Sequence, residues 1–196
     1  MKDFKQFVNA LSNDWTLFLD RDGVINKRLP NEYVKTIHDF EFIEGVTESL
    51  QILTNFFNRI IVVTNQQGIG KKLMTVEMLE DIHNQMITMI VQAGGNIDKI
   101  YFCPSLDSEP ANCRKPGNSM AFQAKYDFPE IEFSKSVMIG DSHSDIEFGS
   151  RLGMTTIFIG NHDVPSHSDF VFDSLYELAI NIVKESDYIR KKGEVC

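Results

Sequence analysis

TLFLDRDGVIN, at residues 16–26, starts with four apolar or β-branched residues and becomes polar at Asp20. A short run of this kind is typical of a strand that is buried on both faces. Asp22 follows, and Gly23 permits a tight turn that holds both carboxylates near one point. An Asp and a Gly after a strand are also ordinary turn residues, so this pair is interpreted together with the rest of the chain.

Four further runs have the same form, because each is short, apolar and ends abruptly. They are RIIVVTN ending at Asn65, KIYFCP ending at Pro104, SVMIGD ending at Asp141 and TTIFIG ending at Gly160. Apolar residues with helical spacing lie between these runs, at Val46, Leu50, Leu53 and Phe57 and again at Leu79, Ile82, Met86 and Ile90. Strands and helices therefore alternate along the chain.

Two helix starts are also visible. Thr75 is a candidate N-cap, and Ser144 with Glu147 forms a candidate capping box for a helix that runs to Leu152. Alternating strands and helices favour right-handed crossovers and a parallel sheet covered on both faces. The sequence predicts an α/β fold, a doubly wound parallel sheet in three α/β/α layers, whose ligands bind beyond the carboxyl ends of the strands.

The length of 196 residues predicts a single domain over residues 1–196. Neither the interval from Asp20 to Thr64 nor that from Thr64 to Lys115 has room for a separate cap domain, so we expect an open site. The chain has 28 acidic and 19 basic residues, which gives a charge of −9. This charge argues against nucleic-acid and membrane partners. We expect a monomer or small homo-oligomer.

The three cysteines form no close pair and are interpreted as reduced thiols of a cytoplasmic protein. The longest stretch without a charged residue covers residues 83–97 and is too short to span a membrane. The N-terminus lacks the apolar core of a secretory signal.

Polar residues at the next strand end and in a later loop supply further site candidates. Thr64 and Asn65 precede glycines that can present backbone donors to an anion, although the same residues also fill ordinary turns. Arg114 and Lys115 stand before Pro116, which restricts the backbone of Lys115. Adjacent cations on a loop are commonly solvated, yet a cation held in place suits a phosphate.

Asp141 ends an apolar run that needs no charge, and a parallel sheet brings it close to Asp20. Asp145 lies in a first helical turn, where an acid also stabilises the helix dipole. Two carboxylates about 4 Å apart repel by roughly 4 kcal/mol at an effective dielectric near 20. A bound Mg²⁺ compensates such a cluster and completes a site for a phosphoryl group.

The motifs DxDGV, TN, K and GDxxxD, in this order, resemble the haloacid dehalogenase (HAD) superfamily of phosphotransferases that use an aspartate nucleophile. DRDGVIN, FEFIEGV, TNQQGIG, CRKPG and IGDSHSD are similar to the branch that holds heptose-bisphosphate and histidinol-phosphate phosphatases. The resemblance covers residues 15–160. It implies a Mg²⁺-dependent phosphatase that acts on a small phosphorylated metabolite through an aspartyl phosphate.

Carried over position by position, the resemblance implies these roles. Asp20 is the nucleophile and Asp22 the general acid and base. The metal ligands are the Asp20 carboxylate, the Asp22 backbone carbonyl and Asp141, and Asp145 supports them. Thr64 and Lys115 hold the phosphoryl group, Asn65 positions the nucleophile, and Arg114 faces the substrate.

One loop departs from the pattern of the branch, whose members often hold structural zinc there with a C-x-H and a later C-x-C. Here the four positions are Cys103, Ser105, Ala111 and Cys113. Structural zinc needs four ligands, so we expect no zinc and two remnant thiols.

A heptose bisphosphate is the favoured substrate, and histidinol phosphate is the alternative. Two other classes of protein compete with this interpretation. A phosphoacceptor receiver domain also combines an aspartate, Mg²⁺, Thr and Lys, but it lacks an acid or base at the position of Asp22. An inactive HAD binding protein is disfavoured because every catalytic position is filled.

Overall fold

Six parallel strands form one sheet in the computed structural model, which describes residues 2–30, 32–110 and 112–193, with side chains as far as residue 187. The order across the sheet is β3-β2-β1-β4-β5-β6. The strands are β1 (Thr16–Leu19), β2 (Arg59–Asn65), β3 (Lys99–Cys103), β4 (Ser136–Gly140), β5 (Thr155–Ile159) and β6 (Phe170–Phe172). All five predicted strands are present, and the predicted α/β class is confirmed.

The central strands are buried on both faces because their side chains alternate between two apolar cores. Leu17 and Leu19 enter one core, and Phe18 enters the other. In β2, Ile60 and Ile61 divide in the same way. This alternation explains why the strand sequences are continuous apolar runs rather than alternating ones.

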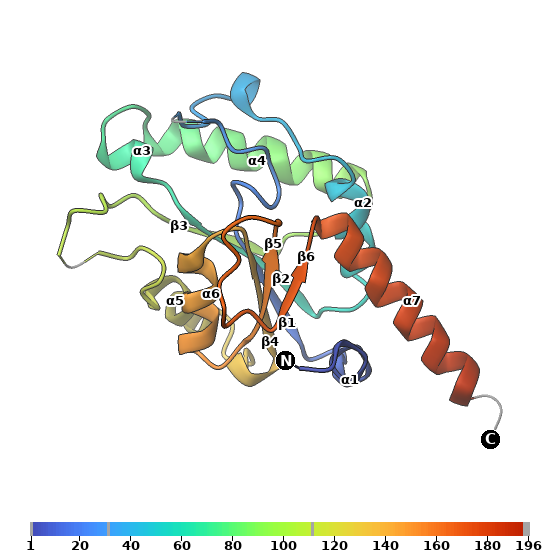
Figure 1. The fold of residues 1–196 in the computed structure, drawn as a ribbon. Helices are drawn as coiled ribbons and strands as arrows, with labels where there is room; N and C mark the ends of the chain where they lie inside the picture. The colour runs from blue at the N-terminus through green and yellow to red at the C-terminus, as the bar shows by residue number, and fades with distance from the viewer. Residues whose placement is uncertain (1, 31, 111, 194–196) are drawn as a thin grey trace.

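Helices cover both faces of the sheet (Figure 1). Residues of α1 (Phe4–Ala10), α2 (Val46–Leu53), α4 (Val76–Gln92) and α7 (Leu175–Gly193) enter the larger core. Residues of α5 (Ser119–Asp127) and α6 (His143–Arg151) enter the smaller one. Shorter turns are η1 (Ile37–Asp39), α3 (Gln67–Gly70) and η2 (Phe133–Lys135).

The helix starts were predicted with mixed success. Thr75 caps α4, since its side chain accepts a hydrogen bond from the Met78 backbone N–H at 3.2 Å. The capping box of α6 was placed wrongly, because the helix begins at His143 and the box consists of Ser142 and Asp145. The sequence SHSDIE contains this box in two overlapping registers, and the earlier one is formed because Asp145 is also drawn into a buried ion pair.

The elements that were not predicted include one helix and one strand. Asp3 caps the short helix α1 by accepting from the Lys5 backbone N–H at 2.9 Å. The strand β6 lies at the sheet edge and has three residues, which are too few to be distinguished as a strand in the sequence.

The topology places the ends of β1 and β4 side by side. From β1 the chain builds outward through β2 to β3 and then returns to add β4 on the opposite side of β1. Leu19 pairs with Ile139, and the Asp20 N–H donates to the Ile139 carbonyl at 2.9 Å. Asp20 and Asp141 therefore leave adjacent strands at the point where the strand order reverses, where such sheets bind ligands.

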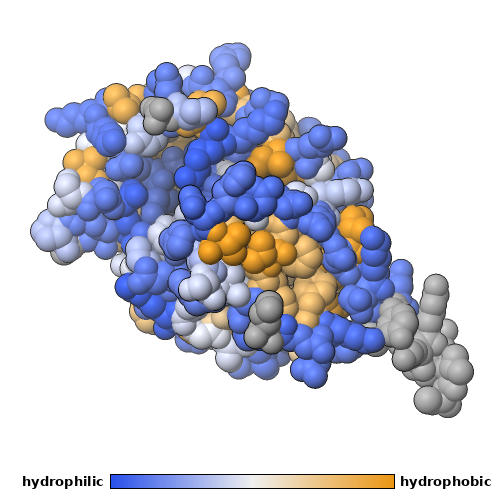
Figure 2. Space-filling view, in the orientation of Figure 1, coloured by the Kyte–Doolittle hydropathy of each residue, from blue (hydrophilic) through white to orange (hydrophobic). Residues whose placement is uncertain are grey.

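The segment between β1 and β2 holds a loop, η1 and α2, and the segment between β2 and β3 holds α3 and α4. Figure 2 shows that hydrophilic residues cover much of one face, with hydrophobic residues reaching the surface in a few separate places. Among the described residues, no helix is both long and apolar enough to cross a membrane.

Candidate phosphate and metal site

The turn after β1 approaches the Asp141 carboxylate closely at Gly23. Gly23 has φ +98°, and a Cβ atom at this position would lie 1.9 Å from Asp141 Oδ2. The turn is closed by the Gly23 N–H, which donates to the Asn26 carbonyl at 2.7 Å. A glycine is required here for its backbone conformation and for the close approach of the Asp141 carboxylate.

Lys115 lies buried beside Asp20. Its Nζ is 2.7 Å from Asp20 Oδ1 and 2.6 Å from Asp145 Oδ1, and it donates to the Val63 carbonyl at 2.6 Å. The cation thus joins the nucleophile candidate to the start of α6. Burial lowers the pKa of Lys115, but the charges of Asp145 and Asp20 outweigh burial and the pKa is raised, so the side chain stays protonated.

Asn65 has a partner other than the one expected from the sequence. Its Oδ1 accepts from the Lys115 N–H at 2.9 Å, and its Nδ2 donates to the Lys115 carbonyl at 3.2 Å. Both ends of the amide therefore hold the backbone of Lys115. Within the described part of the chain, Asn65 reaches Asp20 through that lysine.

Asp20, Asp141 and Asp145 form the cluster that fits a metal ion. One carboxylate oxygen from each lies within 4.8 Å of the others. Arg28 Nη2 donates to Asp141 Oδ1 at 2.7 Å and to the Asp22 backbone carbonyl at 3.1 Å. Those two oxygens are predicted metal ligands, and the Arg28 guanidinium contacts both of them. Oxygen donors arranged in this way suit Mg²⁺.

Asp22 is held apart from this cluster by three side chains. Arg21 Nη2 donates to both carboxylate oxygens at 2.9 Å, and Asn26 Nδ2 and Gln66 Nε2 donate at 2.9 and 2.8 Å. Burial raises the pKa of Asp22, but the charge of Arg21 and these hydrogen bonds outweigh burial and lower it. The group is therefore a carboxylate whose position is set by its donors.

Gln66 links the two halves of the site and was not singled out from the sequence. Its Nε2 also donates to Thr64 Oγ1 at 2.8 Å, so one amide contacts Asp22 and the phosphate-binding candidate Thr64. Thr64 is 1% exposed and Gln66 is 3% exposed. An uncharged residue inside the TNQQG run offers no chemical signal of its own.

A cavity of about 500 Å³ opens over these groups. Its lining contains seven of the eight predicted site residues, namely Asp20, Asp22, Thr64, Asn65, Arg114, Lys115 and Asp145. The eighth, Asp141, lies at its edge through the bond to Arg28, which does line the cavity. The structure thus brings all eight residues to one place.

Known proteins are similar to this chain in sequence. A family model described as HAD-hydrolase-like matches residues 112–178. A Mycobacterium bovis protein named D-glycero-alpha-D-manno-heptose-1,7-bisphosphate 7-phosphatase is 34% identical over 175 residues, which cover 87% of this chain and 92% of that protein. The chain belongs to the haloacid dehalogenase superfamily.

Other HAD relatives agree. A Neisseria meningitidis serogroup A protein named D-glycero-beta-D-manno-heptose-1,7-bisphosphate 7-phosphatase is 33% identical over 181 residues, covering 87% of this chain and 95% of the relative. The solved D,D-heptose 1,7-bisphosphate phosphatase from B. bronchiseptica, complexed with magnesium and phosphate, has a TM-score of 0.78 at 24% identity and covers 87% of this chain and 99% of that one. This last likeness supports the HAD fold.

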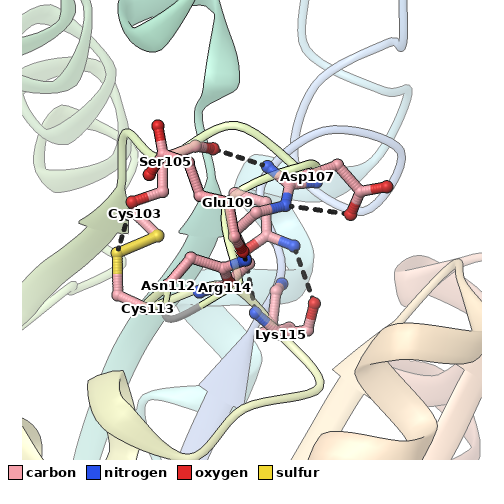
Figure 3. Close-up of a disulfide and its surroundings, with 9 residues drawn as sticks. Cys103, Ser105, Asp107, Glu109, Asn112, Cys113, Arg114 and Lys115 are labelled. Atoms are coloured by element: carbon pink, nitrogen blue, oxygen red, sulfur yellow. Dashed lines mark hydrogen bonds and ion pairs between the residues drawn. A yellow bond between two sulfur atoms is a disulfide. The ribbon is translucent and has the colours of Figure 1, made fainter.

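In the loop before Arg114 of this HAD protein, the two cysteines are not in the state that the sequence predicted. Cys103 and Cys113 form a disulfide, with Cα atoms 5.4 Å apart, so the prediction of two reduced thiols was wrong (Figure 3). The cysteines lie ten residues apart in sequence, and only the return of the loop to the end of β3 brings them together. Ser105 Oγ lies 3.8 Å from Cys113 Sγ, and Ala111 lies outside the described residues. The absence of zinc stays a prediction.

The disulfide stands directly before Arg114, whose side chain is tied to the same loop. Arg114 Nη1 donates to the Ser105 carbonyl at 3.3 Å, and its Nε lies 3.5 Å from Asp107 Oδ1 (Figure 3). The Arg114 N–H donates to Asn112 Oδ1 at 3.0 Å. The disulfide therefore closes the loop, and Arg114 follows it directly and lines the cavity.

Replacing both Cys103 and Cys113 by serine is expected to lower the free energy of unfolding by about 2–3 kcal/mol, since the disulfide restricts the unfolded chain. We also expect KM to rise more than kcat falls, because Arg114 loses its fixed position. Urea unfolding and steady-state kinetics measure the two effects. Cys196→Ser is the control, and equal stability of the double variant and wild type would contradict the prediction. Zinc content of the purified protein is measured at the same time.

Two clustered carboxyls predict an unusual dependence of stability on pH. Burial, with further repulsion from Asp145 and Asp22, raises the pKa of Asp20 to about 6. Burial and the charge of Asp20 raise the pKa of Asp141 to about 7. Groups with raised pKa values stabilise the fold fully at acid pH, below their unfolded pKa of 3.8, and this stability is lost as the pH rises through 6 to 7.

In EDTA, these two groups are therefore expected to lower the midpoint of thermal unfolding as the pH rises from about 4 to about 7. Saturating Mg²⁺ should remove or reverse the fall, because a divalent cation binds the ionised carboxylates. Asp141→Asn should weaken both trends. Identical pH profiles with and without Mg²⁺ would contradict the assigned metal site.

Proposed function

We propose that this chain is a Mg²⁺-dependent phosphatase that removes the 7-phosphate of D-glycero-D-manno-heptose 1,7-bisphosphate. The observation that carries the proposal is 33–34% identity, over 87% of the chain, to relatives named as 7-phosphatases of this substrate. The site geometry supports it, because a carboxylate, a buried lysine and an acid cluster meet in one open cavity.

In the proposed reaction, Asp20 attacks phosphorus and forms an aspartyl phosphate while the sugar oxygen leaves. Asp22, a carboxylate in the free site, takes a proton from solvent before the transfer and gives it to that oxygen, and afterwards takes one from the water that hydrolyses the intermediate. Thr64 and Lys115 hold the phosphoryl group. Mg²⁺ held by Asp20, the Asp22 carbonyl and Asp141, with Asp145 in support, would neutralise charge on the phosphoryl oxygens.

A second phosphate fits the charge of the cavity. Arg28, Lys71 and Arg114 line it in addition to Lys115, and Lys71 Nζ lies 2.9 Å from Tyr33 Oη. These cations favour a bisphosphate over the single phosphate of histidinol phosphate. The acidic balance of the whole chain does not oppose a small anion at this local site.

Phosphate release from a panel of substrates tests the proposal. The panel contains both anomers of the heptose bisphosphate, the corresponding monophosphates and histidinol phosphate, assayed with Mg²⁺ and with EDTA. We expect the highest kcat/KM for one heptose bisphosphate anomer and no turnover in EDTA. Preference for histidinol phosphate would replace the substrate, and a single turnover without continued release would favour a receiver-like protein.

We further propose that residues 1–196 act as one domain with no cap, in the cytoplasm, as a monomer or small homo-oligomer, without nucleic-acid or membrane partners. A reducing cytosol disfavours the Cys103–Cys113 bond. Alkylation of free thiols at the moment of cell lysis, followed by mass analysis, tests the state of that bond in its compartment.

A further inference from the structure

Arg21, the residue between the two site aspartates, is 1% exposed and has no role in the reaction proposed above. Its Nη2 contacts both oxygens of Asp22 at 2.9 Å, and its Nη1 lies 3.1 Å from Nε2 of His83 on α4. Among the described residues, its Nε has no hydrogen-bond partner. The orientation of the guanidinium is therefore set by its two hydrogen-bond partners, Asp22 and His83.

The contact with His83 has one possible polarity. Arginine is always protonated and can only donate, so Nε2 of His83 accepts and the ring proton lies on Nδ1. Burial, followed by the charge of Arg21, lowers the pKa of His83 to about 3, which agrees with a neutral ring. His83 is thus a fixed acceptor for Arg21.

The position of His83 is set by the packing of α4. His83 is 6% exposed, and its neighbours Leu79, Ile82 and Met86 on the helix are buried. Its ring also meets Phe102 of β3 edge to face, with centroids 6.3 Å apart. His83, a buried residue of α4 that lies 62 positions after Arg21, therefore supports a side chain in the turn between the two site aspartates.

We propose that His83 is a positioning residue for catalysis: it orients Arg21, which holds the Asp22 carboxyl where it can serve the leaving oxygen and the attacking water. This inference rests on the proposed phosphatase function. Without the His83 acceptor, Nη1 of Arg21 is left buried and unpaired, and the guanidinium can rotate away from Asp22. Asn26 and Gln66 alone then hold the carboxyl.

Two substrates separate positioning from general stability. An alkyl phosphate such as a sugar phosphate needs a proton on its leaving oxygen, whereas p-nitrophenyl phosphate has a leaving group that departs without one. General acid catalysis contributes about 10²–10⁴-fold, so partial misplacement of Asp22 in His83→Leu should lower kcat/KM for the alkyl phosphate by at least about tenfold. For p-nitrophenyl phosphate, kcat/KM reports the transfer of the phosphoryl group to Asp20. It should fall by less than about threefold.

Matched variants complete the experiment. His83→Gln offers an acceptor oxygen and should recover most of the lost activity on the alkyl phosphate. Ile82→Val, one residue away on α4, loosens the packing without removing a hydrogen bond to Arg21. The ratio of kcat/KM for the alkyl phosphate to kcat/KM for p-nitrophenyl phosphate should stay at its wild-type value. Arg21→Lys keeps the charge but cannot contact both groups, so it should reproduce the selective loss even if His83→Leu fails to fold.

Equal losses on both substrates in His83→Leu and Arg21→Lys would overturn the inference, as would an Ile82→Val variant with the same selective loss. The outcome is separate from the identity of the substrate. A wild-type protein inactive on heptose bisphosphate would overturn the proposed function, and the comparison would then use the best alkyl phosphate of the panel.

Discussion

Asp20→Asn is expected to release phosphate at least about a thousandfold more slowly than the wild-type protein while keeping its fold, because the amide cannot form the aspartyl phosphate. Asparagine retains an oxygen that can accept from Lys115 Nζ, now 2.7 Å from Asp20 Oδ1. It also removes a buried charge whose pKa is raised to about 6. The free energy of unfolding in EDTA near neutral pH should therefore not fall.

Continuous phosphate assays and urea unfolding measure these two effects on one preparation. Asp81→Asn, on the exposed face of α4, makes the same chemical change outside the site and should match the wild-type protein in both. A folded Asp20→Asn protein with more than a few per cent of wild-type turnover would remove Asp20 as the nucleophile.

Lys115→Met is expected to destabilise the metal-free protein by roughly 3–5 kcal/mol, since it leaves buried charge without its partner. Lys115 Nζ is shared between Asp20 and Asp145 at 2.7 and 2.6 Å, and all three residues are buried. Phosphate release should also fall by about two to three orders of magnitude, because a donor to the transferring group is lost. The loss of stability and the loss of activity have different causes and can be separated.

Mg²⁺ provides that separation. Bound near Asp20 and Asp145, it should restore part of the stability of Lys115→Met but little of its activity, because the ion cannot replace the Nζ donor. Lys184→Met, an exposed lysine on α7, is the control for the substitution itself. A Lys115→Met protein as stable as the wild type in EDTA would show that the buried ion pairs contribute little.

The agreement between prediction and structure is greatest where information is local. Asp20 and Asp141 follow apolar runs of strand length, and the rule that parallel strands present their carboxyl ends at one edge was sufficient to bring them together. Thr64, near the end of β2, follows the same logic, whereas Lys115 lies in the loop between β3 and α5 and was predicted from its place before Pro116. Asn65 shows the limit, because its two hydrogen bonds hold the Lys115 backbone 50 residues away rather than Asp20, the nucleophile that it was expected to position.

The amino-acid sequence by itself determined the α/β class, the strands that carry the site and the aspartates at their ends, because burial pattern and turn chemistry act between near neighbours. The tertiary structure alone decided which side chains pair. It joined Cys103 to Cys113, directed Gln66 to Asp22, and placed His83 against Arg21. These contacts depend on how the loop after β3, the segment after β2 and α4 pack around the sheet. The distances that result are set by the fold as a whole rather than by any local pattern.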